Sequence, residues 1–170
     1  MKISTSSSLI ILAVIAACAK APPPPPPPDA GAIKAALTAE MNKMPAMMEK
    51  RDAAAAATVF TEDATWILPD ASTFTGRADI VKGATAFFAS MGPATLTAGS
   101  MTLDKLVVIS DTEALTFSHL TYSIALKGKK PENRVNPIAD YWKKGADGTW
   151  RIAYEVNADG VAPAATAKTP

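Results

Sequence analysis

Two side chains in the second half of the chain, Asp140 and His119, are the main candidates for acid–base chemistry. Asp140 lies in the segment NPIADYWKK, where strand alternation places it on one face with Ile138 and Trp142. A carboxyl group desolvated on such a face has a raised pKa and can donate a hydrogen bond to a ligand carbonyl. The alternative is a surface aspartate, or one paired with a nearby cation such as Arg134.

His119 shares its expected strand face with Leu115 and Phe117. It could act as a general base or contact a ligand, because imidazole changes its charge near neutral pH. A half-buried, hydrogen-bonded structural histidine is the alternative. Asp63 lies at a helix-to-strand junction, where a local hydrogen bond to the backbone accounts for it.

Composition excludes several classes of site. The 170 residues suit a single domain, and they include one cysteine, Cys18, and one histidine. These counts rule out an internal disulfide framework and a Cys/His zinc cage. The formal net charge of +1 gives no basic surface typical of nucleic-acid binding. No GxSxG, HExxH, P-loop, dinucleotide-binding or EF-hand pattern occurs, so we expect no metal and no cofactor.

The N-terminus predicts export and lipid attachment. Residues 1–17 have the form of a secretory signal, with Lys2 before the apolar run LIILAVIAA, which is too short for a membrane-spanning helix of about 20 residues. The run ends in IAAC, which resembles the lipobox of bacterial lipoproteins and implies cleavage before Cys18 and acylation of that residue. An ordinary secretory signal is the alternative. The residue after the cysteine is Ala19, not the aspartate that resembles an inner-membrane retention signal. We therefore expect a lipid anchor in the outer membrane, facing the periplasm.

Proline and small residues set the domain bounds. Residues 18–28 form a lipidated cysteine and a spacer, whose prolines 22–28 favour a polyproline II rod. A ligand for an SH3- or WW-like groove is the alternative for this segment. Residues 160–170 have little to bury and should form a loose tail. The folded domain is therefore expected over residues 29–159.

Helical spacing dominates the first half of this domain. Asp29 is placed to cap a helix beginning AGAIKAALTAEMNK, and Pro45 should kink or interrupt it. Asp52 should cap a second helical piece, DAAAAATVF, and RADIVKGATAFFASM predicts a third that ends at Gly92-Pro93. Met44 and Met48 lie on the apolar stripe of the first region, where they pack in the core or line a ligand cavity.

The rest of the domain alternates as strands do. The expected strands are ATWIL, STFT, MTLDKLVVI, EALTFSHLTYSIAL, NPIADYWKK and TWRIAYEVN. In the last strand, alternation places Trp150, Ile152, Tyr154 and Val156 on one face, and Arg151, Ala153, Glu155 and Asn157 on the other. Helices followed by antiparallel strands favour an α+β domain with its helices on one face of the sheet.

Three segments carry a resemblance to a known family. RDAAAAATVFTEDATWILP, FTGRADI and DYWKKGADGTWRI resemble the SnoaL-like branch of the nuclear transport factor 2-like superfamily, which includes the ketosteroid isomerases. The resemblance covers about residues 32–158. It implies a cone-shaped, strongly curved and mostly antiparallel sheet wrapped around the N-terminal helices, with a pocket at the wide end. It also implies a homodimer formed through the outer sheet face.

The isomerases use an aspartate base, a helix tyrosine and a protonated aspartate. The resemblance places the base at Leu68, the tyrosine at Met44 and the second aspartate at Asp140. Leucine cannot abstract a proton, so isomerase chemistry by this route is not expected. The ligand pocket implied by the register comprises Met44, Met48, Trp66, Leu68, Phe87, Asp140 and Trp142.

Two functions follow as expectations. The first is a non-catalytic envelope lipoprotein that binds a small apolar ligand or a partner. The second is a cofactor-independent SnoaL-like enzyme, an isomerase, cyclase or dehydratase that uses Asp140 and His119 for acid–base work. The second requires both side chains to project into one pocket. A structural oligomeric protein is a third alternative.

Overall fold

A computed structural model describes residues 26–125 and 128–158 of the chain. The expected signal peptide (1–17), the lipidation site Cys18, spacer residues 22–25, Lys127 in an expected turn and the expected tail (160–170) lie outside the described residues. No helix within the described ranges is long and apolar enough to cross a membrane.

Within these ranges the chain forms four helices and six strands. The helices are α1 (Ala30–Met41), α2 (Met44–Lys50), α3 (Ala53–Ala57) and α4 (Arg77–Ser90). The strands are β1 (Phe60–Ile67), β2 (Thr73–Thr75), β3 (Thr95–Ser110), β4 (Glu113–Ala125), β5 (Glu132–Lys144) and β6 (Trp150–Asn157). The expected α+β class is therefore confirmed.

Local signals set the helix ends. Asp29 accepts a hydrogen bond from the Ala32 amide at 3.0 Å, and Asp52 accepts one from Ala55 at 2.9 Å, so both predicted N-caps are confirmed. Pro45 lies in the first turn of α2, where its missing N–H costs nothing, and α1 ends before it. The expected second helix ends early, at Ala57, because the chain enters β1 at Phe60.

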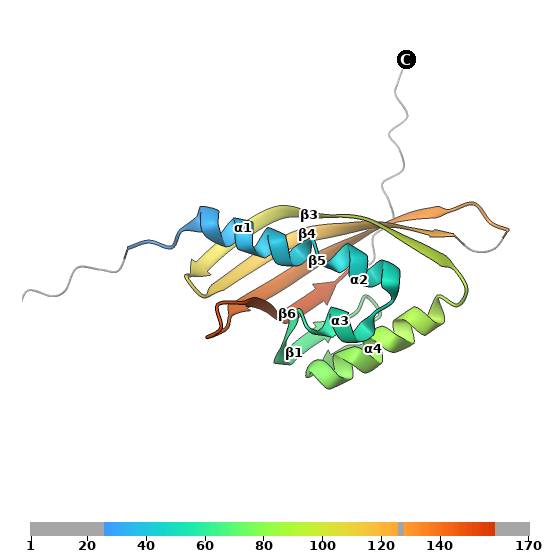
Figure 1. The fold of residues 1–170 in the computed structure, drawn as a ribbon, viewed down its shortest axis with the longest axis horizontal. Helices are drawn as coiled ribbons and strands as arrows, with labels where there is room; N and C mark the ends of the chain where they lie inside the picture. Colours follow the sequence, from blue (N-terminus) through green and yellow to red (C-terminus); the bar gives the residue numbers. More distant parts are fainter. Residues whose placement is uncertain (1–25, 126–127, 159–170) are drawn as a thin grey trace, which may run out of the picture.

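The strands form one sheet in the order β2-β1-β6-β5-β4-β3. Neighbouring strands run antiparallel except β1 and β6, which are parallel. Figure 1 shows α1 and α2 lying across one face of this sheet, with α3 and α4 near β1. The face toward the helices is called the inner face below, and the opposite face the outer face.

A bulge in β6 overturns one expectation from the sequence. Ile152 pairs with Trp142 and Tyr154 with Tyr141, so Ala153 is an extra residue without a counterpart on β5. Trp150 and Ile152 are buried as expected, at 3% and 2% exposure. After the bulge the alternation is reversed, because one inserted residue exchanges the faces of all that follow.

The residues beyond Ala153 therefore point opposite to their predicted directions. Tyr154 and Val156, expected on the face of Trp150, are exposed on the outer face at 42% and 39%. Glu155 and Asn157 are buried on the inner face, at 3% and 8% exposure. The bulge thus brings two polar side chains into the interior.

A packed apolar core fills the space between α1 and the sheet. Leu37 and Met41 of α1 are 0% and 2% exposed, and they belong to one buried cluster with Trp142, Trp150 and Ile152. The 3.6-residue helical period gives α1 this single buried stripe.

Candidate ligand-binding site

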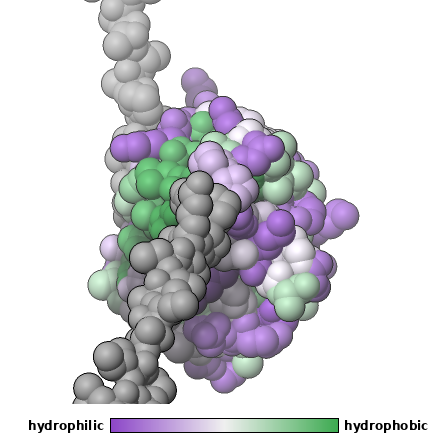
Figure 2. Space-filling model, turned by 90° about the vertical axis from the view of Figure 1, so that its left-hand side faces the viewer, coloured by the Kyte–Doolittle hydropathy of each residue, from purple (hydrophilic) through white to green (hydrophobic). Residues whose placement is uncertain are grey.

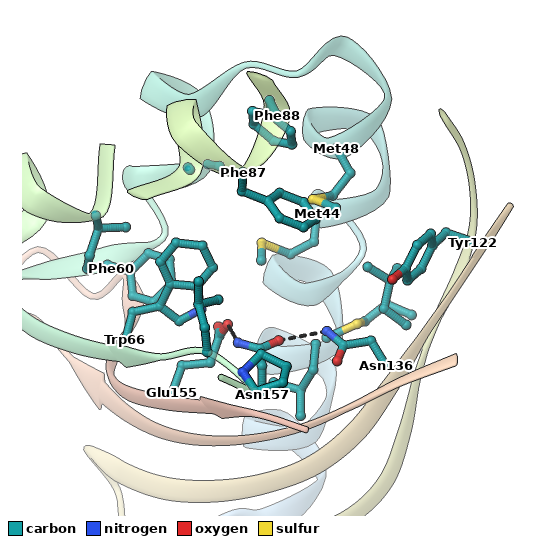
Figure 3. Close-up of a pocket in the computed structure, with 18 residues that line it drawn as sticks. Met44, Met48, Phe60, Trp66, Phe87, Phe88, Tyr122, Asn136, Glu155 and Asn157 are labelled. Carbon is teal, nitrogen blue, oxygen red and sulfur yellow. Dashed lines mark hydrogen bonds between the residues drawn. The ribbon is translucent and has the colours of Figure 1, made fainter. Parts of the chain in front are cut away.

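An apolar cavity of about 140 Å³ lies between the inner face of the sheet and helices α2 and α4 (Figure 3). Aromatic rings and thioethers make up much of its wall. They belong to Phe60, Trp66, Phe87, Phe88, Tyr122, Met44, Met48 and Met101. An apolar wall of this kind suits a ligand with little polar surface.

Helix periodicity positions the wall opposite the sheet. Met44 and Met48 are four residues apart on α2 and so share one helix face. Ala84 and Phe88 have the same spacing on α4, and Phe87 lies next to them. Figure 3 shows the side chains of Met44, Met48 and Phe87 directed toward the strands.

Three hydrogen bonds of Arg51 and Glu49 hold α2 in place beside the cavity. Arg51, just after α2, donates to the carbonyl oxygen of Gly92 at 2.7 Å and also to that of Ala94. Glu49 accepts a hydrogen bond from the Ala98 amide of β3 at 3.0 Å. These contacts join α2 to the segment that leaves α4 and enters β3.

A polar strip lies on the sheet side of the cavity. Asn136 donates through Nδ2 to Oδ1 of Asn157 at 2.7 Å, and Asn157 donates through Nδ2 to Oε1 of Glu155 at 2.5 Å (Figure 3). All three residues line the cavity. The strip exists because the β6 bulge turns Glu155 and Asn157 inward.

Asp140 lies beside Glu155 on the neighbouring strand, where the two residues are paired in register. It is 1% exposed, and its Oδ2 accepts a hydrogen bond from the Thr116 hydroxyl at 3.2 Å. The Thr116 oxygen in turn accepts from the Trp142 indole N–H at 2.8 Å. Buried hydrogen bonds from Trp142 to Thr116 and from Thr116 to Asp140 therefore hold the Asp140 carboxyl group in place.

Burial is the main cause of the altered pKa values of Asp140 and Glu155. It raises the pKa of Asp140 well above the usual value, and the negative charge of Glu155 adds to the effect. Burial also raises the pKa of Glu155, but the hydrogen bond from Asn157 and the nearby Asp140 and Trp66 donors favour its ionised form. Two adjacent buried carboxyls cannot both ionise cheaply, and the pKa is raised more strongly at Asp140, so the pair retains a proton on Asp140.

Three buried polar atoms without a hydrogen-bond partner among the described residues support a proton shared between Asp140 and Glu155. Asp140 Oδ1, Glu155 Oε2 and Trp66 Nε1 are buried and make no hydrogen bond of ordinary geometry to the described residues. Buried polar atoms are seldom left in this state. A proton on Asp140 donated to Glu155 satisfies two of the three atoms.

Five of the seven pocket residues predicted from the sequence line this cavity: Met44, Met48, Trp66, Leu68 and Phe87. The other two, Asp140 and Trp142, are buried on the inner face but are not among the lining residues. Glu155, which is paired with Asp140 on the neighbouring strand, is the carboxyl residue that lines the cavity. Ligand contact by these residues stays a prediction.

His119 and Asp140 face opposite sides of the sheet. His119 alternates with Ser118 and Leu120, which are buried at 3% and 4% exposure, so its ring lies on the outer face. Its Nδ1 is 2.8 Å from Oδ2 of Asp104 on β3. The two candidate catalytic residues therefore do not share a pocket.

Asp63 also lies away from the cavity. It is exposed, and its carboxylate accepts a hydrogen bond from the Thr61 hydroxyl at 2.9 Å. This contact and a hydrogen bond from the backbone lower its pKa. The local explanation expected from the sequence accounts for this residue.

The polar strip was missed by the sequence analysis. Glu155 and Asn157 occupy positions that regular alternation assigns to the outer face, and Asn136 is predicted only as the start of a strand.

Among the described residues, no three His, Cys, Asp or Glu side chains are grouped so that they could hold a metal ion.

Comparison with known proteins agrees with the fold. Residues 41–154, more than half of the chain, match the SnoaL-like domain family. A domain of unknown function with a cystatin-like fold from Nostoc punctiforme is 20% identical, with a TM-score of 0.63 over 78% of this chain and 80% of that one. A ketosteroid isomerase-like protein from Erwinia carotovora atroseptica is 17% identical, with a TM-score of 0.61 over 78% of this chain and 96% of that one.

A third solved structure, ActVI-ORFA from Streptomyces coelicolor, is 20% identical, with a TM-score of 0.65 over 75% of this chain and 97% of that one. No curated protein matches the chain. At such identities the likeness to solved structures is one of fold.

Proposed function

Since this chain belongs to the SnoaL-like domain family, we propose that it is an envelope-anchored protein whose cavity binds a small apolar ligand without converting it. The observation that carries the proposal is the apolar cavity itself, with one polar strip on its sheet side. The polar strip would orient one polar group of the ligand while the rings and thioethers surround the rest.

The volume limits the ligand to roughly one ring. A cavity of about 150 Å³ in another protein holds a single benzene molecule. The cavity here, of about 140 Å³, is of the same size. A four-ring steroid is several times larger than the molecule that such a volume holds, so we expect a smaller ligand than that of a steroid isomerase.

A cavity-filling substitution tests the binding site. Ala84 lines the cavity on α4, whereas Ala86 on the same helix is exposed. Ala84→Leu adds three carbon atoms and should weaken toluene binding at least about tenfold, or about 1.4 kcal/mol. Ala86→Leu is the matched control and should change binding less than about twofold. Toluene bound equally well by both variants would contradict the proposal.

The same geometry argues against turnover. Leu68 and Met44, which line the cavity, carry no group that could transfer a proton at neutral pH. An enzyme remains a second candidate because Glu155 lines the cavity and shares a proton with Asp140. Turnover of a 3-keto-Δ5 steroid or a smaller enolisable ketone that disappears in Glu155→Gln would favour the enzyme.

The anchor belongs to the same proposal, and its support is the IAAC sequence followed by the proline run. Mass spectrometry of membrane-extracted protein should find an N-terminus at Cys18 that carries lipid. Cys18→Ser should release the protein from the membrane fraction. A soluble product cleaved elsewhere, with unchanged location in Cys18→Ser, would contradict the anchor.

We further propose that the outer face of the sheet contacts a second copy of the chain. Its support is a group of exposed apolar residues, and Figure 2 shows apolar side chains gathered in one area at the left of the view. The exposed large apolar residues are Val107, Ile109, Phe117, Tyr154 and Val156. Phe117→Asp should convert a dimer into a monomer in sedimentation experiments, and a wild-type monomer at high concentration would contradict the dimer.

A further inference from the structure

The part of the cavity wall that the structure describes contains one carboxyl group and no basic side chain. Among the described residues that line it, Glu155 carries the carboxyl group, and no lysine, arginine or histidine is present. Glu155 is 3% exposed, and its Oε2 has no hydrogen-bond partner of ordinary geometry. A buried charge in a protein is normally paired with an opposite charge, because leaving it alone is costly.

The hydrogen bonds around Glu155 favour its charged form. Asn136 donates to Asn157, and Asn157 donates to Glu155, so the two amide dipoles both point toward the carboxylate. Asp140 is placed in register on the next strand, where its proton can be donated to the same carboxyl group. These donors stabilise the negative charge but add no positive charge to the site.

The remainder of the wall is suited to an organic cation. The rings of Phe60, Trp66, Phe87, Phe88 and Tyr122 surround the space above Glu155 (Figure 3). Aromatic faces attract a cation through the ring quadrupole, and the attraction is larger where water is excluded. A neutral carbonyl ligand would leave the charge of Glu155 unpaired, and an anionic ligand would be repelled by it.

We propose that the ligand of this cavity is a small organic amine: one apolar ring, or a group of similar size, that bears a single protonated nitrogen paired with Glu155. The inference rests on the proposed function, since it names the class of ligand for the same cavity. The ammonium group donates to the Glu155 carboxylate and to the amide oxygens of the polar strip. The ring occupies the space between the thioethers of α2 and the aromatic side chains.

The same ion pair forms if Glu155 is protonated before binding. A neutral amine then takes the proton from the Glu155 oxygen, and the products are an ammonium ion and a carboxylate. The other titratable groups that face Glu155 from the packed elements are Asp140 on β5 and, across the cavity, Tyr122 on β4. Neither supplies a positive charge.

A matched series of probes tests the ligand class on the full chain. Benzylamine, benzyl alcohol, toluene and benzoate share one ring and differ in the polar group. Binding is measured by isothermal titration calorimetry at neutral pH. Benzylamine should bind at least about tenfold more tightly than benzyl alcohol or toluene, because charge-assisted hydrogen bonds are the stronger ones. Benzoate should bind most weakly.

Substitution of the carboxylate provides the second measurement. Glu155→Gln keeps the shape of the side chain and removes its charge, so it should abolish the preference for benzylamine over benzyl alcohol and toluene. Glu132→Gln removes an exposed carboxylate from the far end of β5 and is the matched control, with no expected change. The probe series on the unaltered chain stands even if Glu155→Gln does not fold.

The outcomes separate the two proposals. Toluene or benzyl alcohol bound as tightly as benzylamine would overturn the amine assignment and leave the binding function intact. Benzylamine affinity unchanged in a folded Glu155→Gln protein would also overturn the amine assignment and leave the binding function intact. Absence of binding by all four probes would overturn the proposed function together with the inference.

Discussion

Replacement of Asp140 by asparagine should flatten the pH dependence of folding stability. In the folded chain Asp140 is 1% exposed and lies beside Glu155, and its pKa is raised well above the usual value, mainly by burial. In the unfolded chain an aspartate ionises near pH 4. Between the two pKa values the folded state therefore holds one proton more than the unfolded state.

The sign and size of the effect follow from proton linkage. Where the folded state binds more protons, stability falls as the pH rises, by about 1.4 kcal/mol per pH unit for one proton. The fall begins above the pKa of the unfolded chain and ends at the raised pKa of the folded pair. Each pH unit between these two pKa values therefore removes about 1.4 kcal/mol, a substantial share of a typical stability of about 5–15 kcal/mol.

Asp140→Asn should remove this proton uptake, because the amide donates to Glu155 without binding a proton. Urea unfolding followed by circular dichroism at pH 5, 6, 7 and 8 measures the free energy of unfolding for both proteins. The variant should become more stable than the wild type as the pH rises. Asp111→Asn, at an exposed position of the β3–β4 turn, is the control and should keep the wild-type slope. Equal slopes for Asp140→Asn and the wild type would refute a proton shared by this pair.

Two further predictions concern the sheet. Trp150→Ala should lower the free energy of unfolding by about 3–5 kcal/mol, because Trp150 is 3% exposed, whereas Arg151→Ala, next to it on the half-exposed side, should cost far less. Equal small losses in urea unfolding would show that the strand is misassigned. His119→Ala should leave toluene affinity within about twofold of the wild type, since the ring lies on the outer face beside Asp104. A tenfold loss of affinity would place His119 in the binding site.

The sequence predicts features of the fold that depend on neighbouring residues. The caps at Asp29 and Asp52 and the break before Pro45 follow from local hydrogen bonding and from the missing proline N–H, and the structure confirms them. The α+β class follows from the change of hydrophobic period. Met44 and Met48 reach the cavity wall because one helix face must turn inward.

The bulge at Ala153 could not be predicted in this way. The segment AYEVN alternates regularly, with the larger apolar side chains at Tyr154 and Val156, so its pattern matches an uninterrupted strand with those two residues inside. The extra residue is defined only by the pairing of β6 with β5, which is a tertiary feature. For this reason the sequence pattern points to Asp140 as the pocket carboxyl and gives no sign of Glu155.

Methyl NMR of the methionines decides whether the cavity between α2, α4 and the sheet binds a small single-ring ligand. Met44, Met48 and Met101 line the cavity, whereas Met91, which follows α4, does not. In protein labelled with ¹³C at the methionine methyl groups, titration with benzylamine, and with toluene in parallel, should shift the three lining resonances saturably and leave that of Met91 in place. Lining resonances that stay unchanged at saturating probe concentrations would contradict the claim.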